Sequence, residues 1–290
     1  MPSNASSPTV IITGANGFVG GSLVKHFQAK GWLVRAWVHS PPAVRLAGVS
    51  YTAYDLGELA PATQLTGADY LVHAAHAPYE TGRRSDELNL RGAQALVNAC
   101  RQQEVKFVFL SSFSACDQAD SHYGKVKLGI EALLDPARDL VLRPGLVLGS
   151  GGLFANMSAM VARRTLIPLV GGGRQPVHLI AVEDLCCVVE KGLIDDIRGI
   201  YMVAEPEPVT MRELLETVAR RQQRNIRFFP VPIWLAYIGV RSGEFLGLRL
   251  PVNSDSVLGL RHLHRVDTRA DLGVFGIQVR GFREMLATRD

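Results

Sequence analysis

The hydrophobic positions of this 290-residue chain follow two alternating patterns. Short runs of β-branched and aromatic residues are typical of strands buried on both faces, whereas longer segments carry apolar residues at helical spacing. The first strand-like run starts at residue 9, and the others lie at 33–38, 49–54, 70–74, 106–111 and 140–143. The helix-like segments lie at 18–30, 85–103 and 123–134. This alternation predicts an α/β fold with a doubly wound parallel sheet.

The pattern becomes irregular after residue 149, where glycine and proline are more frequent. We therefore predict a flexible tail at 1–8, a Rossmann-type domain at 9–150 to which later segments return, and a smaller C-terminal substrate lobe at 151–290. The most apolar stretch of that lobe, 228–240, is too short to cross a membrane and is interpreted as a packed helix.

A glycine-rich turn follows the first predicted strand and opens the first predicted helix. Its glycines are Gly14, Gly17 and Gly20. In a dinucleotide site such glycines permit a tight turn, close approach of the pyrophosphate and close packing of helix on strand. The helix N-terminus then offers N–H groups to the anion. A turn without a ligand is the alternative, and residues later in the chain favour the cofactor.

Tyr123 and Lys127 are four residues apart in a predicted helix and therefore share one face. A free tyrosine has a pKa of about 10 and is a weak base at neutral pH. A neighbouring ammonium group and an oxidised nicotinamide would both lower that pKa. The pair is thus a candidate acid/base centre, while a chance pair on an amphipathic helix is the alternative.

The glycine spacing, Gly-x-x-Gly-x-x-Gly, and the Tyr-x-x-x-Lys pair together resemble the short-chain dehydrogenase/reductase superfamily. The turn is most similar to the extended branch, which contains epimerases, dehydratases and reductases. The similarity covers nearly the whole chain, including segments near Arg143, His178 and Thr210. It implies a Rossmann-type fold and a nicotinamide cofactor. Thr210 and Glu213 also have the spacing of a helix capping box.

The resemblance assigns roles to individual positions. Ser112 would hydrogen-bond the substrate oxygen beside Tyr123, Ser114 would be a second substrate contact, and Asn89 would kink its helix or hold a water of a proton relay. Asn89 as an ordinary helix residue is the alternative. The cofactor site would comprise Gly14, Asn16, Gly17, Phe18, Val19, Gly20, Asp55, Leu56, Ala74, Ala75, His76, Tyr123, Lys127 and Pro144.

The end of the second predicted strand bears on the choice of cofactor. NAD sites usually place Asp or Glu there for the ribose 2′-hydroxyl, and this strand ends without an acid. His39, Ser40 and Arg45 could instead receive a 2′-phosphate, with solvated loop residues as the alternative. We therefore expect NADP(H) as the preferred cofactor and keep NAD(H) open.

The substrate is less constrained. A short loop, 113–122, separates Ser112 from Tyr123, which argues against a sugar-nucleotide lid, and the Asp-Glu pair that dehydratases of this family carry after the Ser/Thr is absent. Asn156 is a candidate substrate contact. An apolar wall or ordinary core packing would explain the cluster of Trp234, Leu235, Tyr237, Phe245 and Leu246.

Composition adds limits. The net charge is +4 without a long basic run, so nucleic acid is not an expected partner, and no cysteine spacing suggests a metal site. Cys100, Cys116, Cys186 and Cys187 are expected to be reduced thiols in or near the core of a cytoplasmic protein. We expect a small-molecule substrate, no membrane insertion, and leave a homodimer open.

Three functional hypotheses follow. The first is an oxidoreductase that transfers a hydride between NADP(H) or NAD(H) and a carbonyl/alcohol pair, with Tyr123 as acid/base. The second is a sugar-nucleotide epimerase or a ketoreductase that uses the same residues. The third is a nucleotide-binding scaffold or sensor without turnover.

Overall fold

The computed structural model describes residues 7–58, 62–78, 84–245 and 254–287, so most of the predicted tail lies outside the described residues. The chain divides into two compact units. Unit 1 consists of Met1–Ser111, Val126–Arg143 and Val182–Tyr201, and unit 2 of Ser112–Lys125, Pro144–Ala181 and Met202–Asp290. Each is described below by itself.

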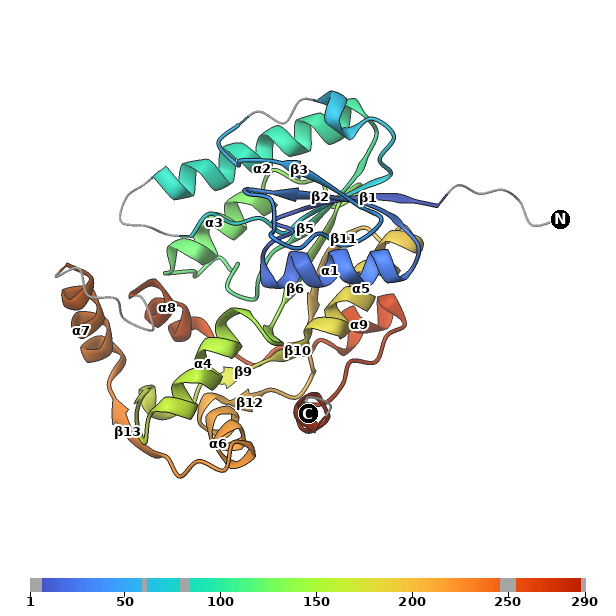
Figure 1. Cartoon of the computed structure of the whole chain (residues 1–290). Helices are drawn as coiled ribbons and strands as arrows, with labels where there is room; N and C mark the ends of the chain where they lie inside the picture. The colour runs from blue at the N-terminus through green and yellow to red at the C-terminus, as the bar shows by residue number, and fades with distance from the viewer. Residues whose placement is uncertain (1–6, 59–61, 79–83, 246–253, 288–290) are drawn as a thin grey trace. The chain divides into compact units, whose positions relative to one another are not determined.

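Unit 1 is built on a sheet with, among the described residues, seven strands in the order β11-β6-β5-β4-β1-β2-β3 (Figure 1). The pairs that join β1 to β2 and β4, β2 to β3, β4 to β5 and β5 to β6 are all parallel. These strands are β1 (Thr9–Thr13), β2 (Leu33–Val38), β3 (Val49–Ala53), β4 (Tyr70–His73), β5 (Lys106–Leu110), β6 (Leu140–Pro144) and β11 (Gly199–Val203). The predicted doubly wound α/β fold is confirmed.

Helices cover both faces of this sheet, as Figure 1 shows. One face carries α1 (Phe18–Ala29) and α5 (Val182–Ile194), which are joined by His26 and Glu190 at 2.8 Å. The other face carries α2 (Arg84–Gln102) and α3 (His122–Glu131), whose apolar residues pack with Phe107 and Phe109 of β5. Full burial of such a side chain contributes about 1.5–3 kcal/mol, so the central strands anchor this unit. A short 3₁₀ helix, η1 (Ala62–Leu65), precedes β4.

Unit 2 contains short strand pairs and helices around a second core, which includes Phe154, Leu214 and Met285. β7 pairs with β10, β9 with β12, and β8 with β13. Its strands are β7 (Leu146–Leu148), β8 (Leu166–Val170), β9 (Pro176–Val177), β10 (Leu179–Ala181), β12 (Val209–Thr210) and β13 (Arg227–Val231). Its helices are α4 (Gly152–Arg163), η2 (Gly171–Gly173), α6 (Met211–Arg221), α7 (Ile233–Phe245), α8 (Ser254–Gly259), η3 (Leu260–His262), α9 (Arg269–Phe275) and α10 (Phe282–Ala287).

The capping box at the start of α6 is confirmed, because Thr210 Oγ1 accepts a hydrogen bond from Glu213 N at 3.1 Å. The prediction of a packed helix over 228–240 is wrong. Residues 227–231 form strand β13, and α7 starts only after Pro232. Proline disrupts a helix interior but suits an edge strand and a helix start, so the two prolines divide the stretch.

Two predictions about burial are also wrong. Cys187 is exposed, although Cys186 beside it is buried, because adjacent residues of α5 point in different directions. Core packing does not explain Trp234, Leu235 and Phe245, since they expose 64%, 47% and 90% of their surface, and the apolar wall stays a prediction. Leu246 lies outside the described residues.

Candidate active site

The glycine turn of unit 1 is fixed by contacts between backbones. Gly14 has φ +66°, and a Cβ there would lie 2.7 Å from Ala75 N. A Cβ on Gly20 would lie 2.2 Å from Gly14 O. Gly17 is the N-cap of α1, with no side-chain cap and no acidic residue in the first turn. The first turn therefore keeps N–H groups available for an anion, as a bound pyrophosphate requires.

The ends of β1, β2 and β3 bring several of the predicted cofactor residues together. Asn16 Nδ2 donates to Ser40 O at 2.5 Å, which ties the glycine turn to the end of β2. His39 Nδ1 lies 3.2 Å from Asp55 Oδ2, and the His39 side chain is exposed while that of Asp55 is half-buried. Asp55 also accepts from Gly57 N at 2.8 Å, as in an ordinary turn. This edge of the sheet is the expected place for an adenosine ribose.

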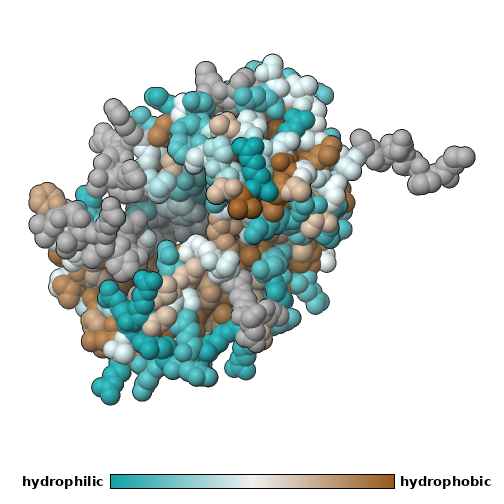
Figure 2. All heavy atoms as spheres, in the orientation of Figure 1, coloured by the Kyte–Doolittle hydropathy of each residue, from teal (hydrophilic) through white to brown (hydrophobic). Residues whose placement is uncertain are grey.

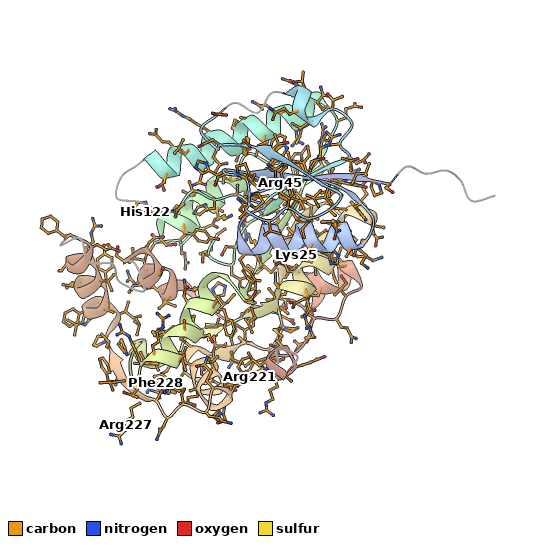
Figure 3. The ribbon with its side chains drawn as sticks, viewed as in Figure 1. Lys25, Arg45, His122, Arg221, Arg227 and Phe228 are labelled. Atoms are coloured by element: carbon orange, nitrogen blue, oxygen red, sulfur yellow. The ribbon has the colours of Figure 1, made fainter. Side chains whose placement is uncertain are left out.

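Arg45 and Leu56 lie at the margin of this group. The Arg45 guanidinium lies 5.8 Å from the centre of the Tyr51 ring, on the exposed loop before β3. Figure 3 labels Arg45, which in that view lies over the strands of unit 1. Leu56 packs against the unit 1 core, and its carbonyl oxygen would be 2.7 Å from a Cβ on Gly92. Leu56 is thus part of the packing between α2 and the end of β3.

The end of β4 is pinned to β1 by a buried hydrogen bond. His73 Nδ1 lies 2.8 Å from Thr13 Oγ1, which also accepts from Ala75 N at 3.2 Å. Thr13 Oγ1 therefore links the backbone after β4 to the buried imidazole of His73. Burial, and next the positive charge of Lys127, lower the pKa of His73 to about 3, so it is neutral at pH 7. Burial and Lys127 also lower the pKa of His76 to about 3.

Asn89 of α2 holds the chain that leaves β4. Its Oδ1 accepts from Ala77 N at 2.9 Å, while Nδ2 donates to Ala77 O at 2.9 Å and to Ser85 O at 2.7 Å. Both amide protons are thereby used on backbone carbonyls. The contacts fit a positioning residue that bends the chain between β4 and α2, next to Ala74, Ala75 and His76.

Lys127 is buried in unit 1 beneath the end of β5. Its Nζ donates to Leu110 O at 2.7 Å and lies 4.7 Å from the centre of the Phe109 ring. Burial lowers the pKa of Lys127 to about 8, and the negative charge of Glu131 opposes part of that shift. Lys127 therefore stays mainly protonated at pH 7, close to its titration point.

Glu131, one helical turn after Lys127, anchors a buried charge cluster that the sequence did not suggest. Its Oε1 accepts from Ser111 Oγ at 2.5 Å and from Arg143 Nε at 2.9 Å, and its Oε2 accepts from Arg143 at 2.5 Å. A bidentate pair of this kind fixes the carboxylate firmly. Two sequence features could have indicated this cluster. They are the Glu four residues after Lys127 and the Arg at the end of a predicted strand.

In unit 2, Tyr123 lies in the first turn of α3 and hydrogen-bonds the Ser112 side chain. Ser112 Oγ also accepts from Ser114 N at 3.1 Å. Burial raises the pKa of Tyr123 above its ordinary value, and the Ser112 hydrogen bond lowers it by less. Loss of hydration at the Tyr123 hydroxyl thus outweighs the stabilising contact with Ser112.

The start of α3 is held by a residue from the far end of the sequence. Asp255 of α8 accepts from His122 N at 2.5 Å and from Tyr123 N at 3.1 Å, so it caps the helix that carries the tyrosine. Gly124 is required here as well, because a Cβ would lie 2.3 Å from Ser114 O. Sequence reasoning missed Asp255, since nothing local links it to residue 123.

Two further predicted positions, Asn156 and Pro144, also belong to unit 2. Asn156 lies exposed in α4, and it has no hydrogen bond to Ser112 or Ser114 among the described residues. Pro144 ends β6, and its carbonyl accepts from Phe113 N at 3.2 Å. In the described part of the chain, no group of three or more His, Cys, Asp or Glu side chains is arranged to hold a metal ion.

The sheet order, the glycine turn and the Tyr-x-x-x-Lys helix define a dinucleotide-binding protein of the short-chain dehydrogenase/reductase type. The family model for the NAD dependent epimerase/dehydratase family matches residues 10–191. The chain therefore belongs to this family of NAD-dependent enzymes. Among the described residues, no helix is both long and apolar enough to cross a bilayer.

Individual proteins that resemble this chain share about a third of its residues or fewer in the aligned part. The chain is 31% identical over 188 residues to a ceramide reductase of Caulobacter vibrioides, which covers 60% of this chain and 57% of that protein. It is 26% identical over 272 residues to protein y4nG of Sinorhizobium fredii, which covers 83% and 67%. A solved structure of MoeE5 in complex with UDP-glucose and NAD is similar with a TM-score of 0.74, 22% identity and 97% coverage of each chain. At that identity the similarity shows the fold alone.

Proposed function

We propose that this protein is an oxidoreductase that moves a hydride between a nicotinamide cofactor and the carbonyl/alcohol group of a small-molecule substrate. Tyr123 is the general acid/base. The observation that carries the proposal is the Tyr123–Ser112 hydrogen bond, with buried Lys127 one helical turn further along α3. A scaffold without turnover would need neither the hydroxyl pair nor the buried ammonium.

The cofactor fits the cradle that the glycines leave open. Gly14, Gly17 and Gly20 keep the approach to the α1 N-terminus free of side chains, and its N–H groups would bind the pyrophosphate. When bound, the nicotinamide supplies or accepts the hydride. The end of β2, tied to the turn through Asn16, would face the adenosine ribose.

The proton chemistry favours reduction of a carbonyl. Because burial raises the pKa of Tyr123, its hydroxyl is protonated at pH 7 and can donate to the developing alkoxide oxygen. Ser112 Oγ would hold that oxygen beside the tyrosine. Lys127, with a pKa of about 8, supplies positive charge that stabilises the phenolate left behind. The name of the ceramide reductase relative supports a reductase over an epimerase.

The test removes single functional groups. Tyr123→Phe should lower turnover about 10²- to 10⁴-fold, because a positioned proton donor contributes that much, while cofactor affinity changes little. Tyr201→Phe is the matched control, since it removes the same group from a tyrosine whose hydroxyl donates to Arg198 O. Turnover on a screened carbonyl substrate and fluorescence titration with cofactor provide the readouts. Wild-type turnover in Tyr123→Phe would overturn the acid/base assignment.

Lys127→Ala should lower both turnover and cofactor affinity, because the ammonium serves the tyrosine and the cofactor ribose. Lys125→Ala is its control on the same helix, with an exposed side chain. Unchanged cofactor affinity in Lys127→Ala would leave only the electrostatic role. Stoichiometric NAD retained through purification would instead favour an epimerase.

We further propose that NADP(H) is preferred over NAD(H). The support is the sequence at the end of β2, which reads Val38, His39, Ser40 and offers no carboxylate to a ribose 2′-hydroxyl. A charge-assisted contact to a 2′-phosphate would favour NADPH by roughly ten- to hundredfold in affinity. Ser40→Asp should reverse the preference in a fluorescence titration. Equal or tighter binding of NADH by the wild type contradicts this assignment and leaves the fold untouched.

A further inference from the structure

Helix α7 of unit 2 presents apolar side chains to solvent. Trp234, Ile238 and Phe245 expose 64%, 52% and 90% of their surface. Helical periodicity places these three positions within about 40° of one another, and Leu235, which is 47% exposed, lies beside them. In the described length of α7 only Gly243 is buried. A helix of a globular unit normally turns its apolar stripe toward a core, and this one does the opposite.

The strand pair that precedes α7 has the same character. β13 pairs with β8 in parallel register, with Arg227 opposite Leu166 and Phe229 opposite Pro168. Leu166 and Phe229 are 56% and 41% exposed, whereas Ile167 and Leu169 on the other face of β8 are buried. An exposed sheet face is usually polar. We call Leu166, Phe229, Trp234, Leu235, Ile238 and Phe245 the apolar face.

A concentrated positive charge lies next to the apolar face. Residues 220–227 contain Arg220, Arg221, Arg224 and Arg227 and no Asp or Glu, and all four arginines are exposed. On the helices that flank this segment, Arg212 pairs with Glu216 and Arg241 with Glu244. Figure 2 shows brown side chains along the margin formed by α7 and β13, with teal where α6 leads into β13. Figure 3 labels Arg221 and Arg227 there.

We propose that the apolar face and the four arginines form a docking surface for an anionic lipid bilayer. Exposed Trp, Phe, Leu and Ile next to arginines are the side chains of interfacial membrane attachment, in which apolar groups enter the acyl boundary and cations contact lipid phosphates. A two-fold contact with a second copy fits less well, because it would bring two arginine-rich segments, 220–227 of each copy, toward each other. The surface lies within unit 2 and does not depend on the proposed reaction.

Vesicle co-sedimentation of the full chain tests the proposal. Binding to phosphatidylcholine vesicles with about 30% phosphatidylglycerol should exceed binding to pure phosphatidylcholine at least tenfold, and it should weaken with added salt. Trp234 fluorescence should shift to the blue with the anionic vesicles, and the shift should vanish in Trp234→Phe. No binding to the anionic vesicles would overturn the proposal.

Two matched pairs of variants locate the surface. Arg224→Gln with Arg227→Gln should weaken vesicle binding by roughly thirtyfold, whereas Lys25→Gln with Arg138→Gln removes the same charge from unit 1 and should have little effect. Trp234→Ser with Ile238→Ser should weaken binding at least tenfold, while Leu33→Ser with Ile194→Ser, also exposed, should not. Thermal unfolding checks that every variant is folded.

If the control pairs weaken vesicle binding as much as the test pairs do, binding is non-specific and the proposed docking surface is wrong. Analytical ultracentrifugation without vesicles tests the alternative that a second copy of the chain binds the apolar face. If the wild type self-associates and Trp234→Ser with Ile238→Ser abolishes this, the apolar face joins two copies of the chain and the lipid assignment is wrong.

Discussion

The two units place their functional groups in different ways. Unit 1 collects Gly14, His39 and His73 because parallel strands that are neighbours in a sheet end at the same edge. Unit 2 holds Tyr123 through Asp255, a hydrogen bond between residues 132 apart in sequence. Groups placed by the regular ladder of a sheet are predictable from local patterns, whereas groups placed by a single distant side chain are not. The cofactor half of the proposed chemistry is therefore the part that sequence motifs describe best.

The largest expected effect tests whether backbone contacts alone fix the unit 1 site. Gly20→Ala would put a Cβ 2.2 Å from Gly14 O, so the turn or α1 must move. We expect about 3 kcal/mol less binding free energy, or roughly a hundredfold loss of cofactor affinity, measured by fluorescence titration.

Gly239→Ala is the comparison in unit 2, because nothing lies within 4 Å of a Cβ at that position of α7. It should leave cofactor affinity unchanged and raise the free energy of unfolding by up to about 1 kcal/mol, since alanine favours a helix. Wild-type affinity in Gly20→Ala would mean that the turn does not form the cofactor cradle.

The next effect is acid sensitivity of unit 1. His73 has a pKa of about 3 when folded and about 6.5 when unfolded, so the unfolded state binds more protons between these values. Stability contributed by neutral His73 is complete above pH 6.5 and is lost as pH falls toward 3. Between pH 6.5 and pH 5 the loss is about 2 kcal/mol.

His73→Leu should remove this pH dependence while costing some stability at pH 7, because Thr13 Oγ1 loses its buried hydrogen bond to the imidazole. Urea unfolding at pH 7, 6 and 5 measures both quantities. An unchanged slope against pH in the variant would show that other groups control the acid response.

The smallest effect on stability concerns unit 2. Asp255→Ala removes the cap of α3 and should cost roughly 0.5–2 kcal/mol of unfolding free energy. Because the capped turn carries Tyr123, turnover should also fall, by about ten- to hundredfold through misplacement of the hydroxyl.

Thr210→Ala removes a comparable cap from α6, also in unit 2. It should cost similar stability and leave turnover near wild type. If the two variants lose turnover equally, Asp255 is only a structural cap, and the long-range placement of Tyr123 has no special role.

Several features were predictable because they follow from short-range chemistry. The alternating apolar runs predicted the strands of unit 1, and β2 falls at the predicted residues 33–38. The Thr210–Glu213 spacing predicted a cap that is present. A buried strand or a capped helix start depends on a few neighbouring residues, so those residues predict the element wherever it lies in the fold.

Other features depended on which distant side chains share a buried space. The cluster of Ser111, Glu131 and Arg143 keeps a carboxylate near Lys127, and burial raises the pKa of Tyr123 by more than the Ser112 hydrogen bond lowers it. Hydration and charge at a site depend on everything that surrounds it, so no spacing rule could give their balance.

The sequence by itself thus determined the class of fold, the glycine turn and the pairing of Tyr123 with Lys127 on one helix, because each follows from periodicity or steric need along the chain. Only the tertiary structure decided that Asp255 caps the helix that carries Tyr123 and that the Asn89 amide donates to backbone carbonyls. It also decided that the apolar residues of α7 face solvent. Those outcomes depend on contacts and exposure, which exist only once distant segments have come together.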